Sequence, residues 1–132
     1  MAGSSASLHE DPNTLSALTI DRHRAIVSIM EEFEAVDWYD QRLEATSDSE
    51  LKEILRHNRD EEKEHASMTL EWLRRHDPAL DGHLRTYLFT DKPVLEIEEQ
   101  AESSDGAEAG QAEQHDTSGC LGIGSLKAKE RR

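Results

Sequence analysis

The residues most capable of chemistry lie in a run of ten polar residues, "RHNRDEEKEH", at positions 56–65. Apolar residues precede and follow this run, and no Gly or Pro interrupts positions 47–77, so the segment is predicted to be helical. Like charges recur four residues apart in the run, and such pairs destabilise an isolated helix. A solvent-exposed surface is therefore not a sufficient explanation of the run. Glu62 and His65 are three residues apart and therefore share one helix face. This Glu-x-x-His pattern is what one helix contributes to a di-iron carboxylate centre.

The partner of a Glu-x-x-His helix in such a centre is a lone glutamate on a facing helix. The segment "MEEFEAVDWYD" offers Glu31, Glu32 and Glu34, and an antiparallel hairpin would place them near Glu62 and His65. A complete centre needs two such halves, so each chain carries half a site, and two chains related by a two-fold axis would complete it. The charges of two copies of Glu32 and Glu62 would balance those of two Fe²⁺ ions, whereas without metal these carboxylates would repel one another and take up protons.

The ligand types narrow the choice of metal. The segment contains no Cys, which argues against structural zinc and iron–sulfur clusters, and no His-Glu-x-x-His zinc pattern. Carboxylates with imidazole suit iron or manganese, with open positions for oxygen. We therefore expect a di-iron site. Two alternatives stay open: a di-manganese or mixed-metal oxidase, and a non-catalytic helical adaptor whose acidic surface buffers cations.

Other polar residues of both helices have two readings, as solvated surface or as weak cation sites that gather metal for the centre, with Ca, Mn and Zn as candidate ions. They form two groups: Glu31, Glu34 and Trp38 in the first, and His57, Glu61 and Glu64 in the second. Tyr39 lies seven residues after Glu32 and so shares its helix face.

The elements that position these residues follow from the apolar pattern. A helix is predicted over residues 14–46, where apolar residues recur in steps of three and four and Asp40 occupies one position that the pattern reserves for an apolar residue. Ser47 is predicted to cap a second helix, with Glu50 completing a capping box. Pro78 ends that helix at about residue 76, and a short third helix is predicted over 78–89. The short connection predicts an antiparallel hairpin.

Composition predicts the organisation of the rest of the chain. Of 132 residues only 35% are hydrophobic, so a thin core and oligomerisation are expected. The net charge of −14 disfavours nucleic acid and anionic membranes, and we expect neither a secretory signal nor a membrane span. The single Cys120 fits a reducing cytoplasm. The expected divisions are a disordered segment 1–13, a helical domain 14–98, a flexible acidic linker 99–118 and a tail 119–132.

Several long segments closely resemble the encapsulated ferritins: "HRAIVSIMEEFEAVDWYDQR", "HNRDEEKEHASMTLEWLRR", "HLRTYLFT" and, near the C-terminus, "LGIGSL". The resemblance covers about residues 20–90 and the tail. It implies an all-α subunit of two long helices and a short third one. It also implies that subunits pair into a four-helix ferritin-like bundle with a ferroxidase centre between them. The pairs would form a decameric ring that works inside a cytoplasmic encapsulin shell, where iron is stored.

The resemblance also implies residue roles. Glu32, Glu62 and His65 match the iron ligands of that family, and Tyr39 matches a tyrosine nearby. Glu31, Glu34 and Trp38 match its metal-uptake region, and His57, Glu61 and Glu64 match a peripheral metal site. The tail segment matches the encapsulin-targeting peptide, with residues Leu121, Gly122, Ile123, Gly124, Ser125 and Leu126. Its three apolar side chains, separated by glycines, could lie extended in a shallow groove. The expected activity is oxidation of Fe²⁺ to Fe³⁺ by O₂, in iron storage and detoxification.

Overall fold

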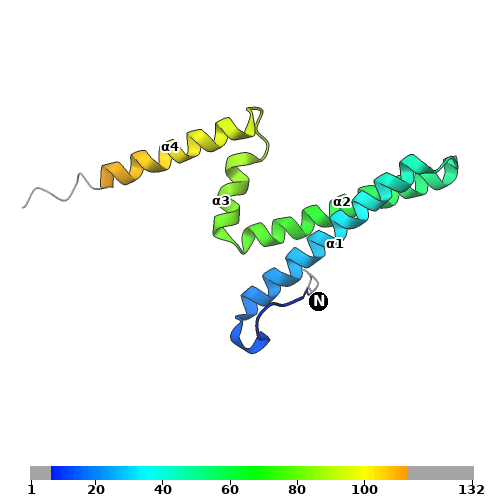
Figure 1. The fold of residues 1–132 in the computed structure, drawn as a ribbon, viewed down its shortest axis with the longest axis horizontal. Coiled ribbons are helices and arrows are strands. Elements are labelled where there is room, and N and C mark those ends of the chain that lie inside the picture. Colours follow the sequence, from blue (N-terminus) through cyan, green and yellow to red (C-terminus); the bar gives the residue numbers. More distant parts are fainter. Residues whose placement is uncertain (1–6, 113–132) are drawn as a thin grey trace, which may run out of the picture. The chain divides into compact units, whose positions relative to one another are not determined.

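The computed structural model describes the backbone of residues 7–112 and the side chains of residues 7–106. Every regular element in this part of the chain is helical, as the sequence predicted (Figure 1). The elements are a 3₁₀ turn η1 (Pro12–Thr14) and the helices α1 (Ala17–Ala45), α2 (Ser49–Arg75), α3 (Pro78–Tyr87) and α4 (Val94–Ala112). The chain divides into two compact units, Met1–Arg85 and Thr86–Arg132, which are described separately. No helix within the described residues has the length and apolar character needed to cross a membrane.

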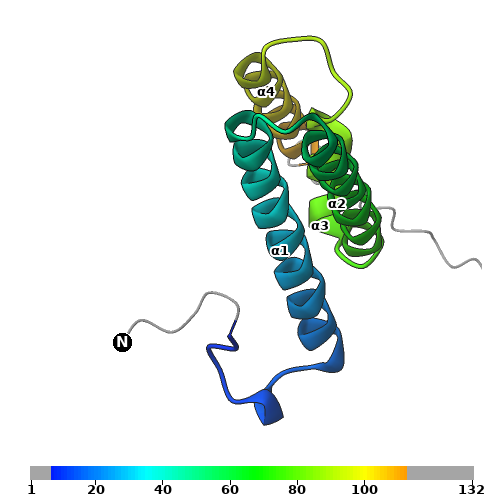
Figure 2. The same cartoon turned by 90° about the vertical axis from the view of Figure 1, so that its right-hand side faces the viewer.

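The first unit is built on an antiparallel hairpin of α1 and α2, which run side by side in opposite directions (Figure 2). Residues 46–48 join the two helices. The buried residues of the pair are few and two of them are small: Ala25, Leu43, Ala66 and Leu73. Large apolar side chains stay exposed on both helices, with 55% of Phe33 and 64% of Met68 accessible. The thin core expected from composition is therefore present, and one chain leaves apolar surface uncovered.

Caps define where the two long helices begin. The Ser16 hydroxyl accepts a hydrogen bond from the Thr19 amide at 3.1 Å and caps α1. The N-cap of α2 is Asp48, whose Oδ1 accepts from the Leu51 amide at 2.7 Å. The predicted cap, Ser47, was wrong by one position. Both residues can cap a helix, but the carboxylate of Asp48 also places a negative charge at the positive end of the helix dipole.

The corner between α2 and α3 is fixed by arginines. Arg22 of α1 donates from Nε to the carbonyl oxygen of His76, the C-cap of α2, at 2.8 Å. Arg74 pairs with Glu71 at 2.7 Å and also contacts Asp81 of α3. Pro78 begins α3, as predicted, because proline at the first helical position loses no intrahelical hydrogen bond. Together these contacts hold α3 against the end of the hairpin.

The observed elements differ from the predicted ones outside the hairpin. The third helix ends two residues early, at Tyr87, and the backbone of Phe89 has a positive φ of 57°, which no helix continues through. Within the predicted disordered segment 1–13, Asp11 caps η1 by accepting from the Asn13 amide at 2.9 Å.

Helix α4 is the largest difference from the sequence prediction. Residues 99–112, predicted as part of a flexible linker 99–118, continue a helix that begins at Val94. Ala, Glu and Gln are strong helix formers and outweigh the serines and glycines of this segment. The Ser104 hydroxyl also donates to the Gln100 carbonyl oxygen at 2.8 Å, so this polar side chain has a hydrogen-bond partner within the helix. Residues 113–118 and the tail 119–132 lie outside the described residues.

Candidate metal centre

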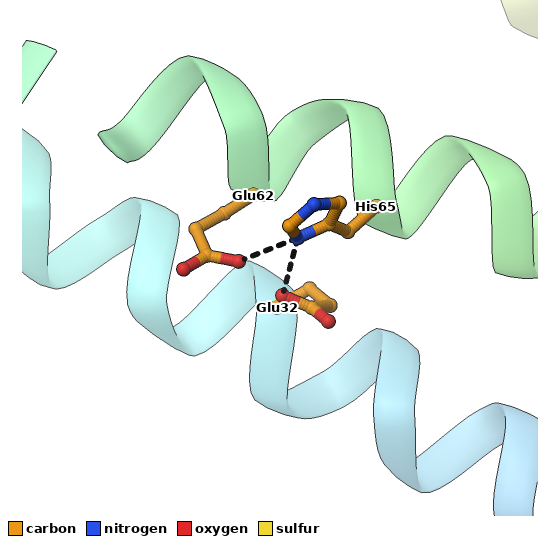
Figure 3. Close-up of side chains that lie close together, drawn as sticks. All are labelled: Glu32, Glu62 and His65. Atoms are coloured by element: carbon orange, nitrogen blue, oxygen red, sulfur yellow. Dashed lines mark hydrogen bonds and ion pairs between the residues drawn. The ribbon is translucent and has the colours of Figure 1, made fainter. Parts of the chain in front are cut away.

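Three side chains that could ligate a metal converge between the middles of α1 and α2 (Figure 3). Glu32 comes from α1, and Glu62 and His65 come from α2. His65 Nδ1 lies 3.2 Å from Glu62 Oε2 and 3.9 Å from Glu32 Oε2. One ligand atom from each residue lies within 4.8 Å of the other two. A divalent cation placed among these atoms would need only side-chain adjustments to bind all three.

Local packing brings the two helices close at this point. Ala66, next to His65 in sequence, is only 2% exposed, and its small side chain allows close approach of the α1 and α2 backbones. One turn before Glu62, Arg59 reaches across to Asp40 of α1, with 2.9 Å between Nη1 and Oδ1. The polar run of the sequence is thus partly accounted for by contacts between the helices.

The two carboxyl groups of the centre influence each other's protonation. A hydrogen bond with Glu62 raises the pKa of Glu32, and partial burial and the negative charge of Glu62 raise it further. The same hydrogen bond lowers the pKa of Glu62, and His65 lowers it as well. Without a cation, Glu32 is therefore the first of the two carboxylates to take up a proton as the pH falls. A bound cation would relieve the repulsion between the carboxylates.

The centre is open on one side of the hairpin. The side chains of Glu32 and Glu62 are 27% and 24% exposed, and that of His65 is 52% exposed. Three ligands from one chain leave further coordination positions for water, for substrate or for a second copy of the site. This arrangement can bind a metal and admit a small reactant, but one chain alone does not enclose the metal.

The first peripheral group, Glu31, Glu34 and Trp38, lies on the exposed surface of α1. The Arg42 guanidinium lies 5.9 Å from the Trp38 ring centroid and 5.6 Å from that of Tyr39, so one cation contacts both rings. This arginine was not predicted from the sequence, although its spacing of four and three residues from the two aromatic residues is the signal that could have found it.

The second peripheral group lies on the exposed surface of α2. His57 Nε2 and Glu61 Oε1 are 3.1 Å apart, and Glu64 is one turn further along the helix. Among the residues that the structure describes, Glu32, Glu62 and His65 are the one set of three ligand side chains close enough to share an ion. Within one chain, therefore, neither peripheral group forms a complete site.

The Arg59–Asp40 ion pair is a contact near the centre that the sequence analysis missed. Its signal was the position of Asp40, where the helical pattern calls for an apolar residue that packs on the facing helix. A charged residue at such a position indicates an oppositely charged partner on the other helix. The polar run supplied several candidates, and only the structure shows which of them pairs.

Comparison with known proteins finds relatives that match nearly the whole chain. The sequence pattern of the EncFtn-like family matches residues 7–91. A Rhodospirillum rubrum protein named "Encapsulated ferritin-like protein" is 57% identical over 131 residues, which are 98% of this chain and 94% of the relative. A Thermotoga maritima "Ferritin-like protein" is 52% identical over 118 residues, which are 89% of this chain and 96% of the relative.

A solved structure shares the fold at high sequence identity. The crystal structure of a Nitrosomonas europaea protein matches with a TM-score of 0.65 and 60% sequence identity, covering 67% of this chain and 97% of that one. The match and the family pattern both support an all-helical subunit of the same kind, and residues 7–91 include the three converging side chains.

Proposed function

The chain belongs to the EncFtn-like family, and we propose that two copies of it build a centre at which O₂ oxidises Fe²⁺ to Fe³⁺. The observation that carries this proposal is the convergence of Glu32, Glu62 and His65 at a half-open point of the hairpin. The ferritin-like relatives support an iron-related function for the fold.

The ligand set favours iron and its oxidation. Two carboxylates and one imidazole from each chain give a hard, oxygen-rich site, which stabilises Fe³⁺ relative to Fe²⁺. In a two-chain centre, Glu32 and Glu62 of each chain would hold the two metal ions through oxygen, and His65 would add a nitrogen ligand. Two Fe²⁺ ions would give up one electron each, and one O₂ would take up these two electrons with two protons from solvent, which balances as H₂O₂. The Fe³⁺ product then leaves for storage.

Two chains are needed because one chain supplies half of the proposed ligands and covers the metal centre on one side only. The apolar side chains exposed on the hairpin, Phe33 and Met68 among them, lose water contact if a second hairpin packs on the same face. A two-fold axis through the centre would then build a four-helix bundle and double the ligand set. By resemblance to the encapsulated ferritins, such pairs form a decameric ring.

The peripheral groups are proposed to supply the centre with cations. Exposed carboxylates on α1 and α2, with the His57–Glu61 pair, would attract Fe²⁺ or other divalent ions through a weak, solvent-screened field. A second copy of the chain could add the ligands that one chain lacks. Tyr39, half-buried and held beside Arg42, is proposed as an aromatic neighbour of the reacting centre.

An encapsulin shell is the proposed partner. The name of the Rhodospirillum rubrum relative indicates that it is encapsulated, and this chain is 57% identical to it. The segment 121–126, outside the described residues, is proposed as the part that docks in the shell, because its apolar side chains are separated by glycines that permit an extended conformation. The protein would then work in the cytoplasm, inside the nanocompartment that stores the iron.

Oxygen consumption and Fe³⁺ formation after addition of Fe²⁺ test the proposed activity. We expect wild-type protein to oxidise Fe²⁺ much faster than buffer does, and Glu62→Gln to lose most of that rate. Glu53→Gln is the matched control: it makes the same change on the same helix, at an exposed carboxylate that pairs with Arg56. Wild-type binding of Fe²⁺ without accelerated O₂ consumption would indicate a cation-buffering adaptor. Faster turnover with Mn²⁺ than with Fe²⁺ would indicate a manganese oxidase.

A further inference from the structure

We propose that the Arg59–Asp40 ion pair is a positioning device that sets the register of α2 against α1, so that Glu62 and His65 meet Glu32. The inference deepens the proposed function and rests on it, because it concerns the same centre. The Arg59 side chain is 21% exposed, and its Nη1 donates to Asp40 Oδ1 at 2.9 Å across the two helices.

The guanidinium of Arg59 is held in a fixed orientation by a second carboxylate. Its Nε donates to Asp60 Oδ1 at 2.9 Å, and its Nη2 lies 2.8 Å from the same oxygen. Lys63 Nζ lies 3.5 Å from the same Asp60 oxygen. Because the planar fork of an arginine is rigid, holding one edge on Asp60 fixes the direction in which the other edge reaches Asp40. The cross-helix contact is therefore directional and not merely an attraction of charges.

The position of the pair suits this role. Arg59 precedes Glu62 by one helical turn, so a movement of Arg59 along α1 moves Glu62 by nearly the same amount. On α1, no residue between Ala25 and Leu43 is buried, and this interval contains both Glu32 and Asp40. In α2, the one buried residue between Ser49 and Trp72 is the small Ala66. Apolar packing in the middle of the hairpin therefore offers no large buried side chain to fix the helix register. The ion pair supplies a specific contact in that interval.

A metal centre needs a well-defined register. A slip of one residue between two helices shifts a side chain by ~1.5 Å along the axis and ~100° around it. Metal–ligand distances tolerate only about 0.2 Å. Groups that orient metal ligands without touching the metal typically change affinity by about 10- to 100-fold when they are mutated. We therefore expect loss of the Arg59–Asp40 pair to weaken metal binding while both helices remain formed.

Co²⁺ binding to the full chain, measured by calorimetry and by visible absorption, tests the inference. In Arg59→Gln and Asp40→Asn we expect the Kd for Co²⁺ to rise at least about tenfold. Arg56→Gln is the matched control, because Arg56 is on the same helix and pairs only within it, with Glu53. Its Kd should stay within about twofold of wild type. Removing the positive charge of Arg59 would by itself strengthen cation binding, so the expected weakening has the opposite sign to a pure charge effect.

A double-mutant cycle shows whether the two residues act as one unit. The double variant, Arg59→Gln with Asp40→Asn, should bind Co²⁺ no more weakly than the single variant with the higher Kd. Wild-type Co²⁺ affinity in Arg59→Gln and Asp40→Asn would overturn the inference, even if their unfolding temperatures fell, since that pattern describes a purely structural pair. If Arg59→Gln fails to fold, Asp40→Asn and Arg59→Lys carry the same comparison. If wild type and Glu62→Gln bind Co²⁺ equally, the proposed centre itself fails, and that result is distinct from a failure of the positioning role.

Discussion

At the scale of single residues, the proposed chemistry depends on three side chains that the fold brings together. Glu62 and His65 share a helix face by spacing, and Glu32 reaches them only because α1 and α2 pack with one particular register. Interaction between the two carboxyl groups raises the pKa of Glu32 and lowers the pKa of Glu62. A bound cation would relieve the repulsion between them.

The exposed carboxylates Glu31 and Glu34 allow a prediction about supply of the metal. If they gather Fe²⁺ for the centre, Glu31→Gln with Glu34→Gln should raise the Fe²⁺ concentration needed for half-maximal oxidation by a few fold, with little change in the rate at saturating Fe²⁺. Initial rates over a range of Fe²⁺ concentrations measure both quantities. Glu44→Gln with Glu50→Gln, two exposed carboxylates near the hairpin turn, is the control. Unchanged half-saturation in the first variant would count against a supply role.

At the scale of elements, α2 has to satisfy packing and chemistry in one helix. Leu73 near its end and Ala66 in its middle are buried, and the same middle carries Glu62, His65 and Arg59. The helix is defined at its start by Asp48 and at its end by the contact of Arg22 with the His76 carbonyl. Its polar middle is tolerated because the facing helix provides Glu32 and Asp40 as partners.

The cap of α2 gives a prediction that separates two neighbouring residues. Replacing Asp48 with Ala removes the acceptor for the Leu51 amide and should lower the free energy of unfolding by about 1 kcal/mol. Ser47→Ala should change it by less than about 0.5 kcal/mol, because Ser47 lies outside the observed cap. Urea unfolding followed by circular dichroism, at one fixed protein concentration, measures both. Equal losses in the two variants would indicate that the cap alternates between the two residues.

The helical pattern of the sequence was sufficient to predict the hairpin and the convergence of Glu32, Glu62 and His65, but not the other features. The spacing of Glu62 and His65 and the acidic segment of α1 both follow helix periodicity, so their convergence could be predicted. The N-cap at Asp48 could not be predicted, since Ser and Asp are both favoured at the N-cap position and Ser47 is the neighbouring residue. Helix α4 was missed because a composition of Ala, Glu, Ser and Gly suits both a linker and a helix. The Arg59–Asp40 pair needed the actual register of two helices.

At the scale of the whole molecule, one chain is incomplete in two respects. Its hairpin leaves large apolar side chains such as Phe33 exposed, and its three ligands remain partly open to solvent. The proposed packing of a second hairpin over Glu32, Glu62 and His65 would bury apolar surface and complete the centre in one step. Metal binding and association are therefore expected to promote each other by mass action.

The C-terminal segment gives a prediction about the partner. Deleting residues 119–132 should abolish co-purification with an encapsulin shell while iron oxidation by the free protein continues. Replacing Ile123 and Leu126 with Asp should have the effect of the deletion, because burying an unpaired charge is costly, and Lys127→Asp with Lys129→Asp is the control for charge alone. Fusion of the segment to an unrelated protein should carry that protein into the shell. Unchanged loading of the truncated chain would transfer the shell contact to the helical part.

The most direct test of a centre shared by two chains is the metal content of each oligomeric species, measured by native mass spectrometry after addition of Fe²⁺ without oxygen. In the wild type, we expect species with an even number of chains to retain Fe²⁺ in pairs and monomers to retain scarcely any. In Glu62→Gln, neither kind of species should retain Fe²⁺. Monomers that retain one Fe²⁺ as firmly as dimers retain two would contradict the shared centre, and would show that Glu32, Glu62 and His65 of a single chain are sufficient.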